Sequence, residues 1–151
     1  MKIVVQRSLN SNVKVDNKIV GEIEKGLVLL VGFNREDTKD VLDKMIDKVV
    51  NLRIFEDENN IMNKSILDIN GSILSISQFT LYADTKKGRR PSYINALNGE
   101  EAIKLYDLFN EKLSKFVHVE KGIFGADMKV SILNDGPTTI ILESGDFSAK
   151  K

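Results

Sequence analysis

The chain has 151 residues, 42% of them hydrophobic, which suits a compact domain, and its 22 basic and 22 acidic residues give a formal net charge of zero. A neutral surface excludes strong affinity for nucleic acids or membranes through bulk charge, so any contact with nucleic acid must come from a local basic segment. The absence of cysteine excludes disulfides and thiolate chemistry, and no apolar run suits a signal peptide or a membrane span. We therefore expect one cytoplasmic domain over residues 1–151.

The first half of the chain predicts four strands, a helix and a further strand. Apolar patterns predict a tight turn at Asp16-Asn17 and strands at 2–8, 12–15, 18–23 and 27–33. The last of these is apolar throughout, which is typical of a strand buried on both faces. Apolar residues recur at helical spacing from Leu42 to Val50. After this helix we expect an extended piece at 52–55, a polar turn region at 56–63 and a strand at 73–79.

The second half contains the clearest helix. Asn98, followed by Glu101 three residues later, is typical of a helix N-terminus, where the asparagine side chain accepts a hydrogen bond from a free backbone N–H. The expected buried stripe consists of Ala102, Leu105, Phe109, Leu113 and Phe116. Strands are expected near 117–121, 128–134 and 138–143. Together these elements predict an α/β fold, a single layered domain with mixed β-sheets and two main helices.

Gly136-Pro137 separates the last two predicted strands and permits two interpretations. Asn134-Asp135-Gly136 is a common hairpin signal, so the local sequence favours a plain turn with a trans bond before Pro137. Proline has no backbone N–H and is normally kept out of paired strands, whereas glycine adopts dihedral angles that other residues reach only at a cost. A break of this kind can also turn backbone carbonyls outward, which would suit recognition of a ligand.

Two other stretches combine polar or charged residues in a pattern that suits binding. Ser77, Gln78 and Thr80 end an otherwise apolar strand, where they either face water or form a polar floor for an ester or a ribose. The second stretch is the loop 85–93, which is either solvated surface or a phosphate-binding site, and its four cations are Lys86, Lys87, Arg89 and Arg90.

The usual catalytic side chains are scarce. His118 is the only histidine, and strand alternation puts it opposite two valines, so we expect an exposed strand residue rather than a base. Without a cysteine or a second histidine, familiar Cys-His and zinc sites are excluded or improbable. The sequence also has no G-x-S-x-G motif and no phosphate loop. We expect no metal and no cofactor.

Several separate motifs, in the same order along nearly the whole chain, resemble the D-aminoacyl-tRNA deacylase family. They are Ile3-Val-Val-Gln-Arg7, Asn51-Leu-Arg-Ile-Phe-Glu56, Ser77-Gln-Phe-Thr-Leu-Tyr82, Lys87-Gly-Arg-Arg-Pro91, Phe124-Gly-Ala-Asp-Met128 and Asn134-Asp-Gly-Pro137. Each motif alone would be weak, and their order makes the resemblance specific. The chain departs from the family's usual residues at Ser8, Arg89 and Thr138, and none of these departures removes a group with an assigned role.

The resemblance implies a layered homodimer without a membrane segment that hydrolyses the ester between a D-amino acid and the 3′ end of tRNA, and also acts on mischarged glycyl-tRNA. It implies that Gly136 and Pro137 form a Gly-cisPro element. The carbonyls of this element would meet the substrate's α-ammonium group in the active site of the partner subunit.

The resemblance also assigns roles around that active site. The residues that match its catalytic wall are Ser77, Gln78, Phe79 and Thr80. Phe124 and Met128 match a segment near the terminal adenosine of tRNA. The residues expected to contact tRNA from the basic loop are Lys86, Lys87, Arg89 and Arg90.

An aminoacyl ester is already activated, and the neighbouring ribose 2′-OH can activate or position the attacking water. Hydrolysis then needs orientation and oxyanion stabilisation more than a strong base, so we expect substrate-assisted chemistry with donors from the backbone around Gln78 and Phe79. A nucleophilic Thr80 ranks second, because nothing near it in sequence activates the hydroxyl. The alternative from another class is a non-catalytic tRNA- or DNA-binding module that uses the basic loop. A metal-dependent or serine hydrolase ranks third.

Overall fold

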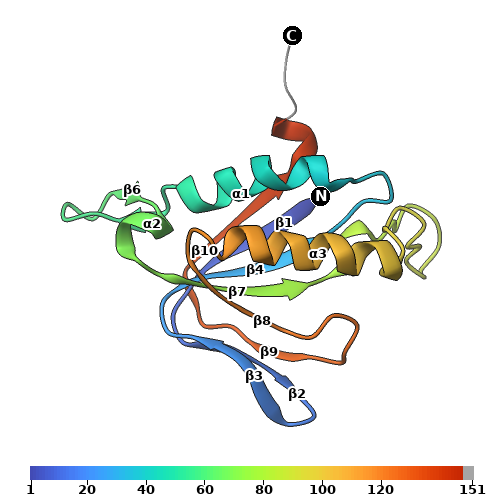
Figure 1. The fold of residues 1–151 in the computed structure, drawn as a ribbon, viewed down its shortest axis with the longest axis horizontal. Helices are drawn as coiled ribbons and strands as arrows, with labels where there is room; N and C mark the ends of the chain where they lie inside the picture. The colour runs from blue at the N-terminus through green and yellow to red at the C-terminus, as the bar shows by residue number, and fades with distance from the viewer. Residues whose placement is uncertain (148–151) are drawn as a thin grey trace.

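The computed structural model describes residues 1–147, so residues 148–151 of the expected domain lie outside the described part. It contains a larger and a smaller sheet together with two main helices (Figure 1). The helices α1 (Leu42–Asn51) and α3 (Gly99–Leu113) cover one face of the larger sheet, and the smaller sheet lies against its other face. The predicted α/β class with mixed sheets is confirmed.

The larger sheet has five strands, and its order is β10 (Asn134–Glu143), β1 (Lys2–Ser8), β4 (Gly26–Gly32), β7 (Ser72–Ser77) and β8 (His118–Lys121). β1 is antiparallel to both of its neighbours, whereas β4, β7 and β8 are parallel. The carboxyl ends of β4 and β7 therefore meet at one edge of the sheet, an arrangement that often forms a binding site.

Strand β4 is buried on both faces, as its apolar run predicts. Leu27, Leu29 and Val31 point into the core beneath the helices. Val28 lies in a second core, between the two sheets. Because side chains alternate along a strand, one continuous apolar run serves both layers.

The two helices contribute most of the apolar side chains above the sheet. α3 begins at Asn98, whose side chain accepts from the backbone N–H of Glu101 (3.0 Å), as predicted. The predicted stripe is wrong at its end, because α3 stops at Leu113 and Phe116 is 57% exposed. Tyr106 is buried instead, since it lies on the same face of the helix as Ala102 and Phe109. Within residues 1–147, no helix is long and apolar enough to cross a membrane.

The smaller sheet consists of β3 (Lys18–Ile23), β2 (Ser11–Val15) and β9 (Lys129–Ser131). Asp16 and Asn17 form the predicted turn between β2 and β3, with φ angles of 51° and 65°. Left-handed backbone at both positions matches the twist of a two-residue hairpin, and short polar side chains tolerate it well.

The prediction of a hairpin at Asn134-Asp135-Gly136 is wrong. β9 pairs with β2 and β10 pairs with β1, so the two segments belong to different sheets. Gly136 and Pro137 lie inside β10, in an irregular stretch between the pairs Gln6–Thr139 and Ser8–Asn134. The bond between Gly136 and Pro137 is cis, in contrast to the trans bond that the local sequence favours.

Short elements complete the fold. The predicted polar turn region contains the small pair β5 (Phe55–Glu56) and β6 (Met62–Lys64), which is followed by the short helix α2 (Ile66–Ile69). The predicted strand at 73–79 ends at Ser77, and a 3₁₀ turn, η2 (Phe79–Tyr82), follows it. Two more 3₁₀ turns are η1 (Lys39–Val41) and η3 (Ser144–Phe147).

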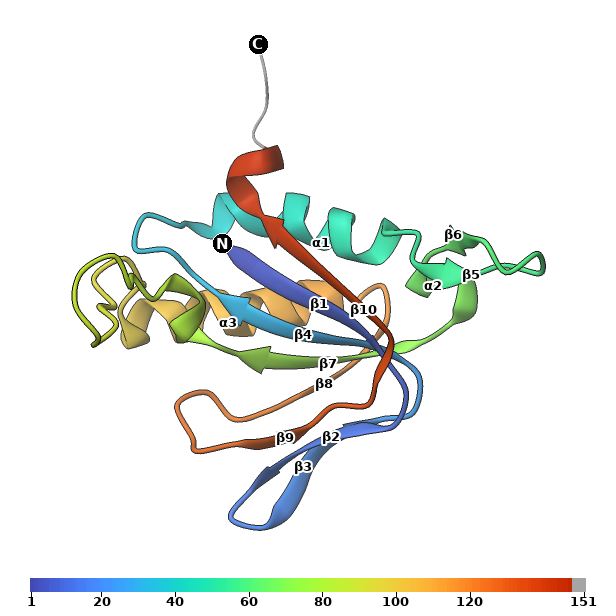
Figure 2. The same cartoon turned by 180° about the vertical axis from the view of Figure 1, so that it is seen from behind.

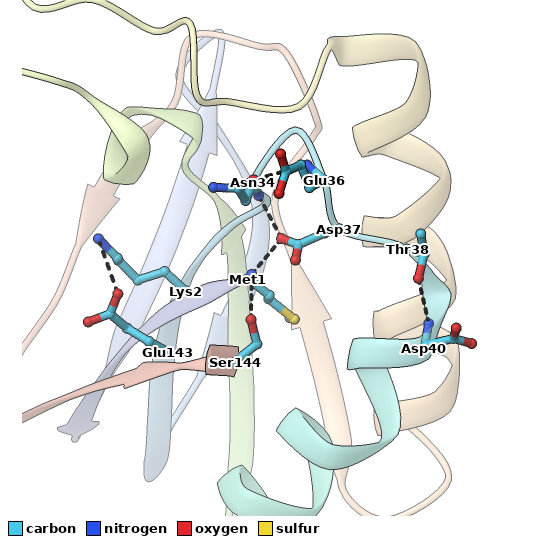
Figure 3. Close-up of polar contacts among 9 residues, drawn as sticks. All are labelled: Met1, Lys2, Asn34, Glu36, Asp37, Thr38, Asp40, Glu143 and Ser144. Atoms are coloured by element: carbon cyan, nitrogen blue, oxygen red, sulfur yellow. Dashed lines mark hydrogen bonds and ion pairs between the residues drawn. The ribbon is translucent and has the colours of Figure 1, made fainter. Parts of the chain in front are cut away.

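The start of β1 is fixed by a group of polar contacts (Figure 3). The Met1 ammonium group donates to Ser144 Oγ (2.9 Å) and pairs with Asp37 Oδ2 (2.5 Å), which also accepts from the backbone N–H of Asn34 (2.6 Å). Burial lowers the pKa of this ammonium group, and the contact with Asp37 opposes the shift. These contacts hold the loop after β4 against the first and last strands.

Candidate active site

A pocket of about 520 Å³ opens at the carboxyl ends of β4 and β7. The loops that follow β7 and β8 lie at this same end of the sheet (Figure 2). The walls of the pocket come from the ends of β4 and β7, the start of α3 and the chain after β8. The lining residues are Val31, Gly32, Phe33, Ile76, Ser77, Gln78, Phe79, Leu97, Gly99, Ala102, Phe124, Gly125, Ala126, Met128 and Val130.

Ser77 and Gln78 reach the pocket because the parallel pairing of β4 with β7 stops there. Val31 and Ser77 are the last paired residues, and the Gln78 N–H donates to Val31 O (2.7 Å). A Cβ atom placed on Gly32 would lie 2.9 Å from Gln78 O, so this close approach requires glycine. The chain then turns into η2, which carries Phe79 at the pocket.

Thr80 does not line the pocket, unlike the other three residues predicted for the catalytic wall. It is exposed, and its Oγ1 accepts a hydrogen bond from Gln78 Nε2 (2.6 Å). No carboxylate or histidine in the described chain bonds to this hydroxyl. The Thr80 side chain therefore contacts Gln78 but lies outside the pocket wall.

Phe124 and Met128, which match the family segment near the terminal adenosine, also line the pocket. The Phe124 ring lies 5.9 Å from the Tyr106 ring, centroid to centroid. Tyr106 is buried, and its hydroxyl donates to Ser75 O (2.8 Å), which ties α3 to β7 below the pocket. Burial raises the pKa of Tyr106, so its hydroxyl keeps the proton that it donates.

No side chain in the pocket lining is ionisable. His118 is exposed on β8, as predicted, and contacts Glu120 (2.7 Å) away from the pocket. Among residues 1–147, no group of three His, Cys, Asp or Glu side chains is arranged to hold a metal ion. The pocket can therefore offer shape, apolar surface, amide and hydroxyl groups and backbone donors, but no side-chain general base.

Gly136 and Pro137 lie far from this pocket within one chain. Through β1, the register places them beside the amino end of β4, whereas the pocket is at the carboxyl end. A separation of about five residues along the strands and two strands across corresponds to roughly 15–20 Å. The structure thus does not bring the predicted substrate-binding pair and the predicted catalytic wall together in a single chain.

Arg7 supports the Gly136-Pro137 segment. In the sequence it belongs to the motif Ile3-Val-Val-Gln-Arg7, and no role of its own was predicted for it. Its guanidinium is buried, donates to Ile54 O (2.8 Å) and Asp135 O (3.2 Å), and pairs with the Asp135 carboxylate (3.3 Å). Such a buried arginine holds backbone carbonyls on both sides at fixed positions. Nothing local in the sequence predicts these partners, because they are distant along the chain.

The four cations of the basic loop are all exposed and lie outside the pocket lining; they are Lys86, Lys87, Arg89 and Arg90. Within residues 1–147, none of them forms an ion pair with a carboxylate. The loop is closed at its base by reciprocal backbone hydrogen bonds between Asp84 and Ser92 (2.7 and 2.9 Å). It therefore presents positive charge to solvent from a fixed base.

Sequence reasoning missed Phe33, Leu97 and the start of α3 as parts of the pocket. Leu97 N donates to Phe33 O (3.0 Å), which joins the end of β4 to the segment before α3. The aromatic residue after β4 and the Asn98 cap of α3 were both visible in the sequence. Their proximity was not, because it depends on which strands pair.

Comparisons with known proteins agree over most of the chain. The family described as D-Tyr-tRNA(Tyr) deacylase matches residues 4–143. Proteins named D-aminoacyl-tRNA deacylase from Clostridium botulinum, strains Langeland and Okra, are each 57% identical over 145 residues, which cover 95% of this chain and 97% of theirs.

Two solved structures have the same fold. A chain named c-Myc DNA Unwinding Element Binding Protein superposes with a TM-score of 0.90 at 41% identity, covering 95% of this chain and 98% of that one. A probable eukaryotic D-amino acid tRNA deacylase superposes with a TM-score of 0.80 at 17% identity, covering 93% and 97%. The second comparison supports the fold alone.

The sheet-and-helix fold and these matches define the class of protein as an enzyme, a deacylase. The chain belongs to the D-Tyr-tRNA(Tyr) deacylase family.

Proposed function

We propose that this protein hydrolyses the ester bond of D-aminoacyl-tRNA to free tRNA and D-amino acid, and that it also deacylates glycyl-tRNA. The observation that carries the proposal is the pocket at the ends of β4 and β7, lined by Ser77, Gln78 and Phe79 and by no ionisable side chain. Family membership supports the same substrate class. A cytoplasmic location follows from this substrate.

The donor for the developing oxyanion is the backbone at the start of η2. The Gln78 N–H is already used by Val31 O, which removes it from the expected set of donors. The N–H groups of Phe79 and Thr80 lie in the first turn of η2, and within the described chain they donate to no acceptor. We therefore assign oxyanion stabilisation to the Phe79 N–H, which belongs to a pocket residue.

The proton transfer in this proposal depends on the substrate. With no side-chain base in the pocket lining, the 2′-OH of the terminal ribose positions and activates the water that attacks the ester carbon. The water oxygen forms a bond to the ester carbon, the bond between this carbon and the ribose 3′ oxygen breaks, and the 3′ oxygen leaves with the proton that the water gives up. Replacing the terminal adenosine of D-tyrosyl-tRNA by 2′-deoxyadenosine is expected to lower the single-turnover rate at least about tenfold, as for loss of a general catalyst. An unchanged rate would exclude this role of the 2′-OH.

Selection of the D-enantiomer is assigned to Gly136 and Pro137 of a second copy of the chain in a homodimer. Their carbonyls accept hydrogen bonds from the substrate's α-ammonium group, and the pocket wall then blocks an L side chain. Glycine has no side chain to clash, so its ester is accepted. The distance between Gly136-Pro137 and the pocket within one chain supports a contribution from the partner.

The deciding experiment compares matched D-tyrosyl-, L-tyrosyl- and glycyl-tRNA with the wild-type protein. We expect rapid release of D-tyrosine and glycine, and release of L-tyrosine no faster than in buffer. A chelator in parallel reactions tests the metal-dependent alternative. Equal hydrolysis of the D- and L-substrates would refute the assigned selection.

The second candidate function is binding of nucleic acid without catalysis. Two observations favour it: the exposed basic loop, and 41% identity to a chain named as a DNA unwinding element binding protein. Tight, salt-sensitive binding of duplex DNA by a protein that releases no D-amino acid would support this candidate. Deacylation with weak binding of DNA would exclude it.

A further inference from the structure

An aromatic pair lies at the mouth of the pocket, and only one of its members lines the pocket. The rings of Phe79 and Tyr93 are 4.9 Å apart, centroid to centroid, with an interplanar angle of 67°. Both are exposed, Phe79 by 55% and Tyr93 by 40%. Phe79 lines the pocket and Tyr93 does not. In this edge-to-face arrangement one ring supports the other and part of its aromatic surface stays open to solvent.

Backbone contacts fix Tyr93 between the pocket and the basic loop. On one side, Ser92 exchanges two hydrogen bonds with Asp84 at the base of that loop. On the other side, Ala96 forms a bridge with Asn34, and Leu97 enters the pocket wall. The loop 83–98 lies beyond the carboxyl end of β7 in Figure 2. A chain that leaves the pocket past Phe79 therefore reaches the Tyr93 ring and then the cations at 86–90.

An exposed ring on the same loop as exposed cations is a combination that suits binding of single-stranded nucleic acid. A base stacks on the ring, and the phosphates contact the cations. The acceptor end of tRNA is single-stranded, and in the proposed function its terminal adenosine occupies the pocket.

We propose that Tyr93 is the stacking platform for the unpaired base that precedes the terminal adenosine. The inference rests on the proposed function, and it adds a binding site outside the pocket. A phosphate chain through this site passes the basic loop, whose four cations have no carboxylate partners within residues 1–147. Tyr93 therefore contributes to binding of the nucleic acid and not to the reacting ester.

The test compares Tyr93→Ala, Tyr93→Leu and Tyr93→Phe with the wild type on two substrates, D-tyrosyl-tRNA and D-tyrosyl-adenosine. The small substrate keeps the ester and the adenosine but lacks the preceding nucleotide. For the tRNA we expect KM to rise about tenfold with the Ala and Leu variants and to stay near wild type with the Phe variant, with kcat within about twofold. For D-tyrosyl-adenosine we expect all four proteins to have the same KM.

A matched control is Ile94→Ala, because Ile94 is the next residue and is 66% exposed but has no ring. This variant is expected to have the wild-type KM for both substrates. A direct readout uses uncharged tRNA with 2-aminopurine in place of the penultimate base. Its fluorescence is expected to be quenched by the wild type and by Tyr93→Phe, but not by Tyr93→Ala.

Three outcomes would overturn the inference. The first is an unchanged KM for D-tyrosyl-tRNA with Tyr93→Ala. The second is an equal rise in KM for D-tyrosyl-adenosine, which would mean that Tyr93 acts only by supporting Phe79 in the pocket. The third is a changed oligomeric state of Tyr93→Ala in sedimentation, which would assign the ring to contact between subunits. A wild-type protein that hydrolyses neither substrate would instead refute the proposed function itself.

Discussion

Thr80 combines a suggestive position in the sequence with an unsuitable environment in the structure. Its hydroxyl is exposed, lies outside the pocket lining and accepts from the Gln78 side chain. A nucleophilic hydroxyl needs a partner that removes its proton, and an amide N–H donor cannot do so. In the proposed mechanism the direct contact with the ester comes instead from the backbone N–H of Phe79, which only a substitution to proline would remove.

We predict that Thr80→Ala keeps most of its activity, with kcat for D-aminoacyl-tRNA lowered by less than about threefold. The expected loss is small because the variant removes one hydrogen bond to Gln78 and no reactive group. The measurement is single-turnover release of D-tyrosine under saturating enzyme, with Thr85→Ala as an exposed control. A variant that binds the substrate but does not release the amino acid would make Thr80 the nucleophile.

Gly136 is the residue most restricted by its own backbone. Its φ of +122° is rarely adopted by residues with a side chain, and a Cβ atom would lie 2.5 Å from Thr138 Oγ1 and 2.6 Å from Thr138 N. We predict that Gly136→Ala lowers the free energy of unfolding by about 1–3 kcal/mol and greatly reduces deacylation. Gly145→Ala is the matched control, because a Cβ atom there meets nothing within 4 Å. Denaturant unfolding measures the free energy of unfolding of both variants, and deacylation assays measure their activity. A Gly136→Ala protein with wild-type stability and activity would contradict the prediction.

At the scale of elements, the sequence predicted what depends on neighbouring residues. The apolar run of β4, the turn at Asp16-Asn17 and the Asn98 cap of α3 all have local causes, and all are observed. The prediction of a hairpin before Pro137 was wrong. Asn134-Asp135-Gly136 has the composition of a turn, but β10 pairs with β1 and β9 pairs with β2, so the two strands belong to different sheets. Long-range pairing is not visible in local composition.

The candidate site shows the same limit. Ser77, Gln78 and Phe79 were identified because they follow one another, and Phe124 and Met128 because the resemblance includes them. Phe33 and Leu97 join the pocket through a backbone contact between distant segments, so no local pattern indicates them. Tyr93 was visible as the end of the basic loop, but only the geometry places its ring on Phe79.

Helix α2 has a capping box that predicts how its stability depends on pH. The Asp68 carboxylate accepts from the Ser65 N–H (2.8 Å), and Ser65 Oγ accepts from the Asp68 N–H (3.2 Å). The backbone hydrogen bond from Ser65, assisted by its hydroxyl, lowers the pKa of Asp68 below 3.8. Since the folded pKa is the lower one, the stabilisation is fully present above 3.8 and is lost as pH falls through the folded value.

We therefore predict that Asp68→Asn is less stable than wild type at neutral pH and that the difference shrinks as pH falls below 3.8. Urea unfolding of both proteins at a series of pH values measures this difference. A gap in unfolding free energy that stays constant down to pH of about 2 would show that the charge of Asp68 does not contribute.

On the scale of the whole molecule, the pocket and Gly136-Pro137 lie at opposite ends of the β4 strand direction. A chain that uses both on one substrate needs a second copy arranged so that each copy completes the other's site. A monomer would then have no complete site. Dilution below the dissociation constant of the dimer would therefore abolish activity.

Mixing two inactive variants tests this arrangement. We predict that Phe79→Pro, which removes the assigned oxyanion donor, and Gly136→Ala, each nearly inactive alone, recover about a quarter of wild-type activity after subunit exchange, because half of the dimers are mixed and each mixed dimer has one intact site. Native mass spectrometry measures the mixed dimers, and each variant mixed with itself is the control. Mixed dimers without activity would show that both residues act within one chain.

The pocket lining contains no group that can gain or lose a proton near neutral pH. In the proposed mechanism, reactivity therefore enters with the bound molecule, as an activated bond and a hydroxyl group beside it. Peptide bonds and ordinary lipid esters bring neither, so this mechanism predicts that the protein does not cut them. The proposed mechanism thus predicts that the protein leaves the amides of its surroundings intact, because the pocket lining supplies no group to attack a bond that is not already activated.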